Sequence, residues 1–216
     1  MNRYKALGAI MVVWASAAQA DEVVIAALGD SLTQGFGLPV DQGFVPQLQS
    51  WLEAEGAAVK LINAGVSGDT TAGGLARVGW TLTPEVDGMI VALGGNDLLR
   101  GLDPAQARSN IEGILQAAQA ADVDVLLIGM EAPGNYGPDY KAAFDALYPE
   151  LAETYGTGYL DSFFAGLTPD DTSPDPAQLQ QWFQPDGIHP NADGVARIVT
   201  RIGPEVMQLI ETIGED

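Results

Sequence analysis

The sequence predicts an α/β fold built on a parallel central sheet, and two features of the chain indicate it. Four short apolar runs are continuous rather than alternating, which is typical of strands that are buried on both faces. Longer segments with helical periodicity separate these runs, so crossover helices connect strands that lie parallel, with helices covering both faces of the sheet. The four runs are Val23 to Leu28, Val59 to Ile62, Met89 to Leu93 and Val125 to Met130.

The first two of the helices that we expect have apolar residues at helical spacing. One covers 44–55, where Phe44, Leu48, Trp51 and Leu52 share a face. A second begins at Asp103-Pro104, a combination of N-cap residue and first-turn proline, and Gln106 stands where a capping-box partner would. Its inward side chains are Ala107, Ile111, Ile114, Leu115 and Ala118.

Two further helices complete the pattern. Tyr140 to Tyr155 carries one apolar face, and Asn191 is placed to cap a last helix near the C-terminus. Gly203-Pro204 interrupts that last helix, and a proline inside a helix removes a backbone donor, so we expect a break or kink there. The inward residues of these two helices are Phe144, Leu147, Tyr148 and Leu151, and Val195, Ile198, Val199 and Ile202.

Composition excludes several classes of function. The 216 residues carry a formal net charge of −20, which disfavours nucleic acid as a partner because phosphate binding needs clustered Lys and Arg. The chain has no Cys, which excludes a thiolate nucleophile, and one His, which excludes metal sites built from several imidazoles. With 47% hydrophobic residues the chain can bury a core, and we expect a single domain over 21–216.

Residues 1–20 have the pattern of a secretory signal peptide. Arg3 and Lys5 precede an apolar run from Ala6 to Ala18, and an A-x-A cleavage signature ends at Ala20. The alternative is a membrane anchor, but the run is shorter than the ~20 residues that a spanning helix needs. We therefore expect cleavage near Ala20, a periplasmic or secreted product, and no stable membrane insertion.

The first two strands are each followed by residues that suit chemistry at the carboxyl edge of the sheet, where open α/β sheets bind ligands. Ser31 follows the first strand directly, so it is either an exposed nucleophile or merely the N-cap of the next helix. After the second strand, Gly68 can turn its backbone N–H toward a ligand. Asp69 or Thr70 would cap the helix that follows.

Two further segments offer polar side chains. Asn96 follows the third strand and is either an oxyanion donor or a turn residue that satisfies its own backbone. Asp186 and His189 lie three positions apart in a loop before the last helix. The carboxylate could orient the imidazole, which could then deprotonate a serine hydroxyl. Taken alone, the histidine is better explained as a surface or cap residue.

Taken together and in this order, the four segments resemble the SGNH, or GDSL, hydrolase family. The resemblance runs from Val23 nearly to the C-terminus and is strongest to the bacterial periplasmic acyl-thioesterase, arylesterase and lysophospholipase group. The segments that carry it are Gly29 to Gly35, Ser67 to Thr70, Gly74 to Arg77, Gly94 to Asp97 with Arg100-Gly101, Asn135 to Gly137, the helix from Tyr140 to Leu151, and Asp186 to Asn191.

The resemblance implies a fold and a mechanism. The family fold is a three-layer α/β/α sandwich of flavodoxin-like type. Ser31 would be the nucleophile, His189 the general base and then acid, and Asp186 the residue that orients His189. The N–H groups of Ser31 and Gly68 and the side chain of Asn96 would form the oxyanion hole. The resemblance implies no cofactor and no metal ion, a small-molecule or lipid ester or thioester as substrate, and a monomer.

Residues in the loops after the third and fourth strands are candidates for an acyl pocket. Leu98, Leu99, Pro133 and Tyr136 lie in what the resemblance implies are substrate loops. Trp182 and Phe183, before the catalytic loop, are equally consistent with core packing.

Three functional interpretations follow. The first is a secreted serine hydrolase of aryl esters, acyl thioesters and lysophospholipids. The alternatives are a carbohydrate acetylesterase on the same fold and, less favoured because the motif residues are intact, a non-catalytic binding module. The acidity either reflects solubility in a saline medium or includes a weak cation site at Asp170, Asp171 and Asp175, which lack the spacing of an EF-hand.

Overall fold

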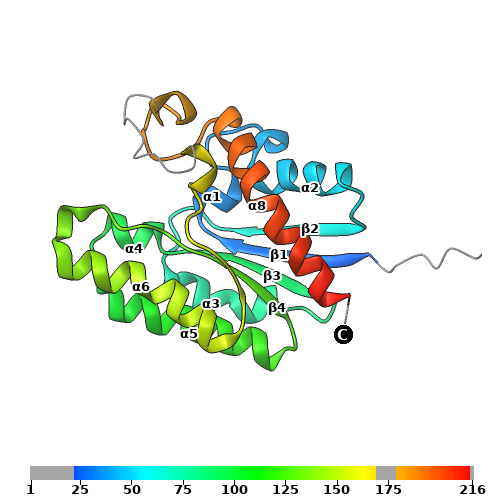
Figure 1. Ribbon diagram of the computed structural model, residues 1–216, viewed down its shortest axis with the longest axis horizontal. Helices are drawn as coiled ribbons and strands as arrows, with labels where there is room; N and C mark the ends of the chain where they lie inside the picture. The colour runs from blue at the N-terminus through cyan, green and yellow to red at the C-terminus, as the bar shows by residue number, and fades with distance from the viewer. Residues whose placement is uncertain (1–21, 169–178, 215–216) are drawn as a thin grey trace, which may run out of the picture.

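The computed structural model describes residues 22–168 and 179–214, and its centre is a sheet of five parallel strands (Figure 1). The order across the sheet is β2-β1-β3-β4-β5, which is the flavodoxin-like order and confirms the predicted fold class. The bounds are β1 Val23–Gly29, β2 Val59–Gly65, β3 Gly88–Ala92, β4 Asp124–Ile128 and β5 Gly158–Leu160.

Helices cover both faces of this sheet, as Figure 1 shows, and make the three layers. Helices α2 (Phe44–Ala54) and α8 (Ala192–Ile213) pack together on one face. Helices α3 (Thr71–Thr81), α5 (Pro104–Ala120) and α6 (Pro138–Tyr155) lie on the other, with α5 in the middle. The short helices are α1 (Ser31–Gln34) and α4 (Gly95–Leu99), with 3-10 turns at Val40–Gln42, Gly134–Tyr136, Ala165–Leu167 and Gln180–Trp182.

The inner strands form the core because both of their faces are covered. Ile25 to Leu28 of β1 and all of β3 are buried, as the continuous apolar runs predicted. The order in which successive strands are added reverses at β1, because β2 lies on one side of β1 and the later strands β3, β4 and β5 lie on the other. A crevice at the carboxyl ends of these strands is therefore the place where a ligand site is expected.

The structure corrects the sequence analysis at three places. Strand β5 was not predicted, because Gly158–Leu160 is too short to give a periodic signal. Helix α8 continues through Gly203 and Pro204 without a break. A side chain at Gly203 would collide with the ring of Trp51 on α2, so the glycine serves close packing of the two helices. Asp103 caps α5 as predicted, but the Gln106 side chain donates to Asn110 instead of accepting from the Asp103 N–H.

Among the residues that the structure describes, no helix combines the length and apolar content needed to cross a bilayer. The predicted signal segment, residues 1–20, lies outside the described residues. The same holds for Asp170, Asp171 and Asp175, the carboxylates considered for a cation site.

Candidate active site

Ser31 is the first residue of α1 and follows β1 after a single intervening residue. That residue, Asp30, is the N-cap, and its Oδ1 accepts a hydrogen bond from the Leu32 N–H at 3.0 Å. The interpretation of Ser31 as the N-cap is therefore wrong. The cap is made by its neighbour, and the Ser31 hydroxyl does not cap α1.

The loop before α8 brings His189 to Ser31 across 158 positions of sequence. His189 Nε2 lies 2.8 Å from Ser31 Oγ, and His189 Nδ1 lies 2.7 Å from Asp186 Oδ2. The loop itself is fixed by its backbone, since the Gln184 N–H donates to the His189 carbonyl at 2.7 Å. The Phe36 ring packs against the imidazole with 4.6 Å between ring centroids. Three predicted side chains thus form one continuous chain of hydrogen bonds.

The electrostatics of Asp186 fix the direction of that chain. Hydrogen bonds from His189 and from the backbone N–H groups of Ile188 and His189 lower the pKa of the Asp186 carboxyl to about 2. Asp186 is consequently a carboxylate at neutral pH and can only accept from Nδ1. In the neutral imidazole this leaves Nε2 as the acceptor that faces the Ser31 hydroxyl, which is the arrangement a general base requires.

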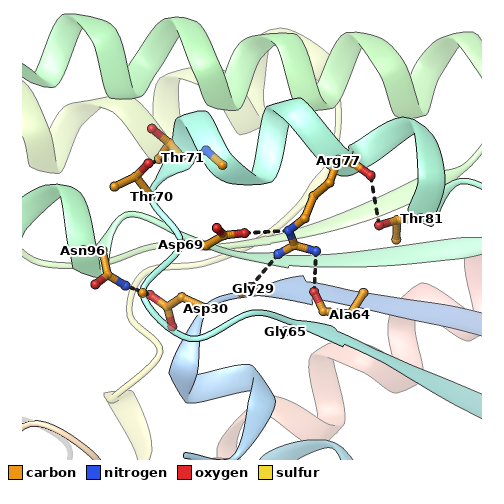
Figure 2. Close-up of polar contacts among 12 residues, drawn as sticks. Gly29, Asp30, Ala64, Gly65, Asp69, Thr70, Thr71, Arg77, Thr81 and Asn96 are labelled. Carbon is orange, nitrogen blue, oxygen red and sulfur yellow. Dashed lines mark hydrogen bonds and ion pairs between the residues drawn. The ribbon is translucent and has the colours of Figure 1, made fainter.

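Asn96 is joined to the Ser31 segment through Asp30. The Asn96 Nδ2 group donates to Asp30 Oδ2 at 3.1 Å, a contact visible in Figure 2. Asp30 is only 2% exposed, and this burial raises the pKa of its carboxyl, although the donors Leu32 N–H and Asn96 act in the opposite direction. An amide has two N–H groups, so one can bind Asp30 while the other remains for a ligand.

Gly68 lies in the exposed loop between β2 and α3, with a φ of +83° that favours glycine. Its carbonyl accepts a hydrogen bond from Arg100, the residue that follows α4, at 2.8 Å. The next residue, Asp69, forms an ion pair with Arg77, and Thr70 caps α3 as one of the two predicted candidates. The loops after β2 and β3 are therefore in direct contact.

Two buried groups to which the sequence analysis gave no role at the site support α4 and the loop before it. Asp97 accepts from both the N–H and the hydroxyl of Thr71, at 2.8 and 2.7 Å, and Asn110 in turn donates to the Thr71 hydroxyl. The Tyr148 hydroxyl donates to the Leu93 carbonyl at 2.8 Å. Burial raises the pKa of Tyr148 well above its ordinary value, so it stays a donor. The position of Asp97, a charged residue next to Asn96, is the signal that the sequence carried for the contacts with Thr71.

The candidate pocket residues differ in exposure. Leu99 and Tyr136 are 59% and 43% exposed, and Pro133 is exposed as well, whereas Leu98 is 8% exposed and belongs to the core. The Tyr136 ring lies against Gly101, two residues beyond Leu99, so the two loops meet. The aromatic pair before the catalytic loop packs within the protein, with Trp182 under Arg197 and Phe183 against Phe164.

Within residues 22–168 and 179–214, no three His, Asp or Glu side chains are grouped so that they could hold a metal ion. The chemistry available at this site is that of a hydroxyl, an imidazole, a carboxylate and nearby hydrogen-bond donors.

A comparison with known protein families decides the classification. The model of the GDSL-like lipase/acylhydrolase family matches residues 27–197, a span that includes Ser31, Gly68, Asn96, Asp186 and His189. The chain belongs to this family. The resemblance noted in the sequence is thereby confirmed.

Individual relatives agree with this family. The esterase TesA of Pseudomonas aeruginosa is 37% identical, over 89% of this chain and 92% of its own length. Thioesterase 1/protease 1/lysophospholipase L1 of Escherichia coli is 35% identical, over 90% of this chain and 87% of its own length. The crystal structure of AlinE4, an SGNH-hydrolase family esterase, is 40% identical with a TM-score of 0.70, covering 87% of this chain and 96% of that one. The protein is an enzyme of this esterase and thioesterase type.

Proposed function

We propose that this GDSL-family enzyme hydrolyses carboxylic esters and thioesters through an acyl-enzyme formed on Ser31. The observation that carries the proposal is the chain of hydrogen bonds from Ser31 Oγ through His189 to Asp186, at 2.8 and 2.7 Å. Both distances lie within the range for direct proton transfer between a nucleophile, its base and the group that orients the base.

The acylation step follows from these contacts. Ser31 Oγ attacks the carbonyl carbon of the substrate while His189 Nε2 takes the hydroxyl proton, and Asp186 stabilises the imidazolium that results. The carbonyl π-electron pair moves to oxygen and gives a tetrahedral oxyanion. When this collapses, the bond to the alcohol or thiol breaks, and His189 gives its proton to that leaving group. Water then repeats the sequence on the acyl-enzyme and releases the acid.

Three donors are proposed for the oxyanion: the N–H groups of Ser31 and Gly68 and the free N–H of Asn96. Ser31 contributes from the first turn of α1, Gly68 from the loop after β2 and Asn96 from α4. Donors aimed at developing charge are worth most in a site that is built before the substrate arrives, and each one lost typically costs ~10²–10³ in rate.

The proposed substrates are aryl esters, acyl thioesters and lysophospholipids, which share an acyl chain that needs an apolar surface. The exposed side chains of Leu99, Pro133 and Tyr136 could supply that surface, and the buried Leu98 would form its base. Apolar side chains exposed to this degree are consistent with a contact that forms only when a substrate binds.

A substrate panel with Ser31→Ala tests the proposal. Wild type and variant are compared on aryl esters of increasing acyl length, an acyl thioester, a lysophospholipid and an acetylated sugar. We expect Ser31→Ala to lower kcat by at least ~10⁴-fold on every substrate that wild type hydrolyses. Ser50→Ala, an exposed serine on α2 that bonds only to a carbonyl of its own helix, is the matched control. Undiminished hydrolysis by Ser31→Ala would overturn the assignment. Activity confined to the acetylated sugar would instead favour the carbohydrate acetylesterase.

We further propose that residues 1–20 are a signal peptide, that the single domain begins at Asp21, and that the exported protein is a monomer. The A-x-A signature ending at Ala20 supports the cleavage site. N-terminal sequencing of the protein recovered from the periplasm or medium should begin at Asp21, and light scattering should give the mass of one chain. An intact N-terminus on exported protein would contradict the first part.

A further inference from the structure

Arg77 of α3 reaches the ends of the two strands that precede Ser31 and Gly68. Its Nε donates to Asp69 Oδ2 at 2.6 Å, and its two terminal nitrogens donate to the carbonyls of Ala64 and Gly29, each at 2.7 Å. Figure 2 shows the guanidinium lying between these three acceptors. Every nitrogen of the guanidinium is thus engaged, and none of the three partners belongs to Arg77's own helix.

The identity of the three partners points to a purpose beyond stability. Gly29 is the last residue of β1 and is two positions before Ser31. Asp69 directly follows Gly68, and Ala64 is the last residue but one of β2. One rigid, planar group therefore holds both sides of the gap between the β1 and β2 loops, which carry the two backbone donors proposed for the oxyanion.

The β2 side of this gap is also held by other contacts, since the Gly68 carbonyl accepts from Arg100 at 2.8 Å and the Asn63 and Ser67 side chains donate to Gln34. Among the described residues β2 is an edge strand that pairs with β1 alone, and residues 66–68 after it are exposed. The Val66 N–H also bonds to the Gly29 carbonyl, at 3.0 Å, so that carbonyl receives donors from both the loop and Arg77. The Arg77 side chain is 16% exposed, and a contact shielded to this degree holds its geometry better than a surface pair.

We propose that Arg77 is a positioning residue that sets the spacing between the Ser31 and Gly68 N–H donors and thereby sets transition-state stabilisation. This inference rests on the proposed function. Lysine cannot substitute for arginine here, because an ammonium is a point charge with no planar fork and cannot reach three acceptors spread around its side chain. A shift of a donor by about 1 Å can cost ~10²-fold in rate, even when the altered residue is remote from the chemistry.

The test compares Arg77→Lys with Arg108→Lys, which alters an exposed ion pair to Glu150 on α6. On an aryl ester we expect Arg77→Lys to lower kcat by ~10–100-fold while KM stays within about threefold, because the lost stabilisation concerns the oxyanion and not the ground state. The acid limb of kcat/KM should keep its midpoint, since Asp186 and His189 are not touched by Arg77. Arg108→Lys should leave all three quantities unchanged.

Double variants separate positioning from a general loss of structure. Gly68→Ala strains a left-handed backbone and displaces the peptide that carries the Gly68 N–H, which Arg77→Lys is also expected to displace. The fold-change in kcat of the double variant should therefore be smaller than the product of the two single fold-changes. Asn96→Ala removes a donor that Arg77 does not touch, so the fold-changes in kcat of Asn96→Ala and Arg77→Lys should multiply in the double variant. Multiplication in both pairs, or kcat of Arg77→Lys within twofold of wild type, would overturn the inference.

Two controls keep the outcomes distinct. If Arg77→Lys does not fold, as judged by circular dichroism, Asp69→Ala takes its place, because it removes the acceptor that Arg77 Nε binds in the loop after β2. A kcat that falls at least threefold with unchanged KM then supports the inference, and an unchanged kcat contradicts it. Ser31→Ala is run in parallel: if it retains activity, the proposed function fails whatever Arg77 does, whereas an inactive Ser31→Ala with an active Arg77→Lys refutes only this inference.

Discussion

Replacement of Asp30 by Asn should impair the proposed oxyanion hole and leave the fold in place. One carboxylate oxygen of Asp30 caps α1 through the Leu32 N–H, and the other accepts from Asn96 Nδ2. Asn is as good an N-cap as Asp, so its oxygen can keep the first contact. Its amide nitrogen then faces the amide nitrogen of Asn96, and two donors meet where a donor met an acceptor.

The size of the effect follows from this single lost contact. Complete loss of one oxyanion donor costs ~10²–10³ in kcat, and here Asn96 is displaced rather than removed, so we expect a fall of about 10–100-fold. KM should change little, because the substrate carbonyl carries its full charge only after attack. Stopped-flow hydrolysis of an aryl ester gives both constants.

Although Asp30→Asn should lower kcat, its free energy of unfolding should gain on that of wild type as pH rises. Because burial raises the pKa of Asp30 above its ordinary 3.8, the folded protein binds this proton more tightly than the unfolded chain does. The contribution of Asp30 to the stability of wild type therefore falls as pH rises from below 3.8 through the folded pKa, and it levels off above it. Asn has no such loss. The free energy of unfolding of Asp30→Asn, relative to wild type, should rise over this window in urea titrations.

The reciprocal variant supplies the control. Asp30→Asn combined with Asn96→Asp restores a donor–acceptor contact between the two positions, so stability at neutral pH should recover. It also places a carboxylate where the oxyanion donor should be, so kcat should fall below that of the single variant. A kcat for Asp30→Asn within twofold of wild type, measured beside an impaired Asn96→Ala, would refute the reasoning.

Three further predictions concern other parts of the structure. Asp186→Asn should lower kcat by ~10³–10⁴-fold while circular dichroism shows an intact fold, since the imidazole would be held in the wrong tautomer; an activity loss below tenfold would contradict this. In Asp30→Asn, which removes the buried carboxyl with a raised pKa, the acid limb of kcat/KM should have a limiting slope of one above about pH 3, because a lowered pKa keeps Asp186 ionised until pH falls toward about 2; a slope of two would show that a further group titrates. Gly203→Ala should destabilise the protein by about 1–3 kcal/mol in urea unfolding, because the added methyl meets the Trp51 ring, and an equally stable variant would show that α2 and α8 can separate at no cost.

The sequence was most informative where local pattern and function coincide. The apolar runs predicted β1 to β4, and the residues after them predicted where polar groups would gather, because parallel strands deliver their carboxyl ends to one edge. Strand β5 carries three residues and no periodicity, so only its pairing with β4 reveals it. The continuity of α8 through Pro204 depends on packing against α2, a tertiary effect that outweighs the local preference of proline.

Residues that position the site were harder to predict than residues that react, and the reason is physical. A nucleophile, a base and an oxyanion donor must each have one particular functional group, so their identities appear as motifs. A positioning contact needs only a donor and an acceptor at the right place, and either can come from a distant element. Arg77 illustrates this, since one of its partners, the Gly29 carbonyl, is 48 positions away. Because every residue has a backbone carbonyl, this acceptor leaves no signal in the sequence. Two signals were available: Arg77 belongs to the segment from Gly74 to Arg77 that carries the family resemblance, and it borders the buried stripe of α3, formed by Thr71, Gly74 and Val78. An arginine that borders an apolar face must find acceptors inside the protein.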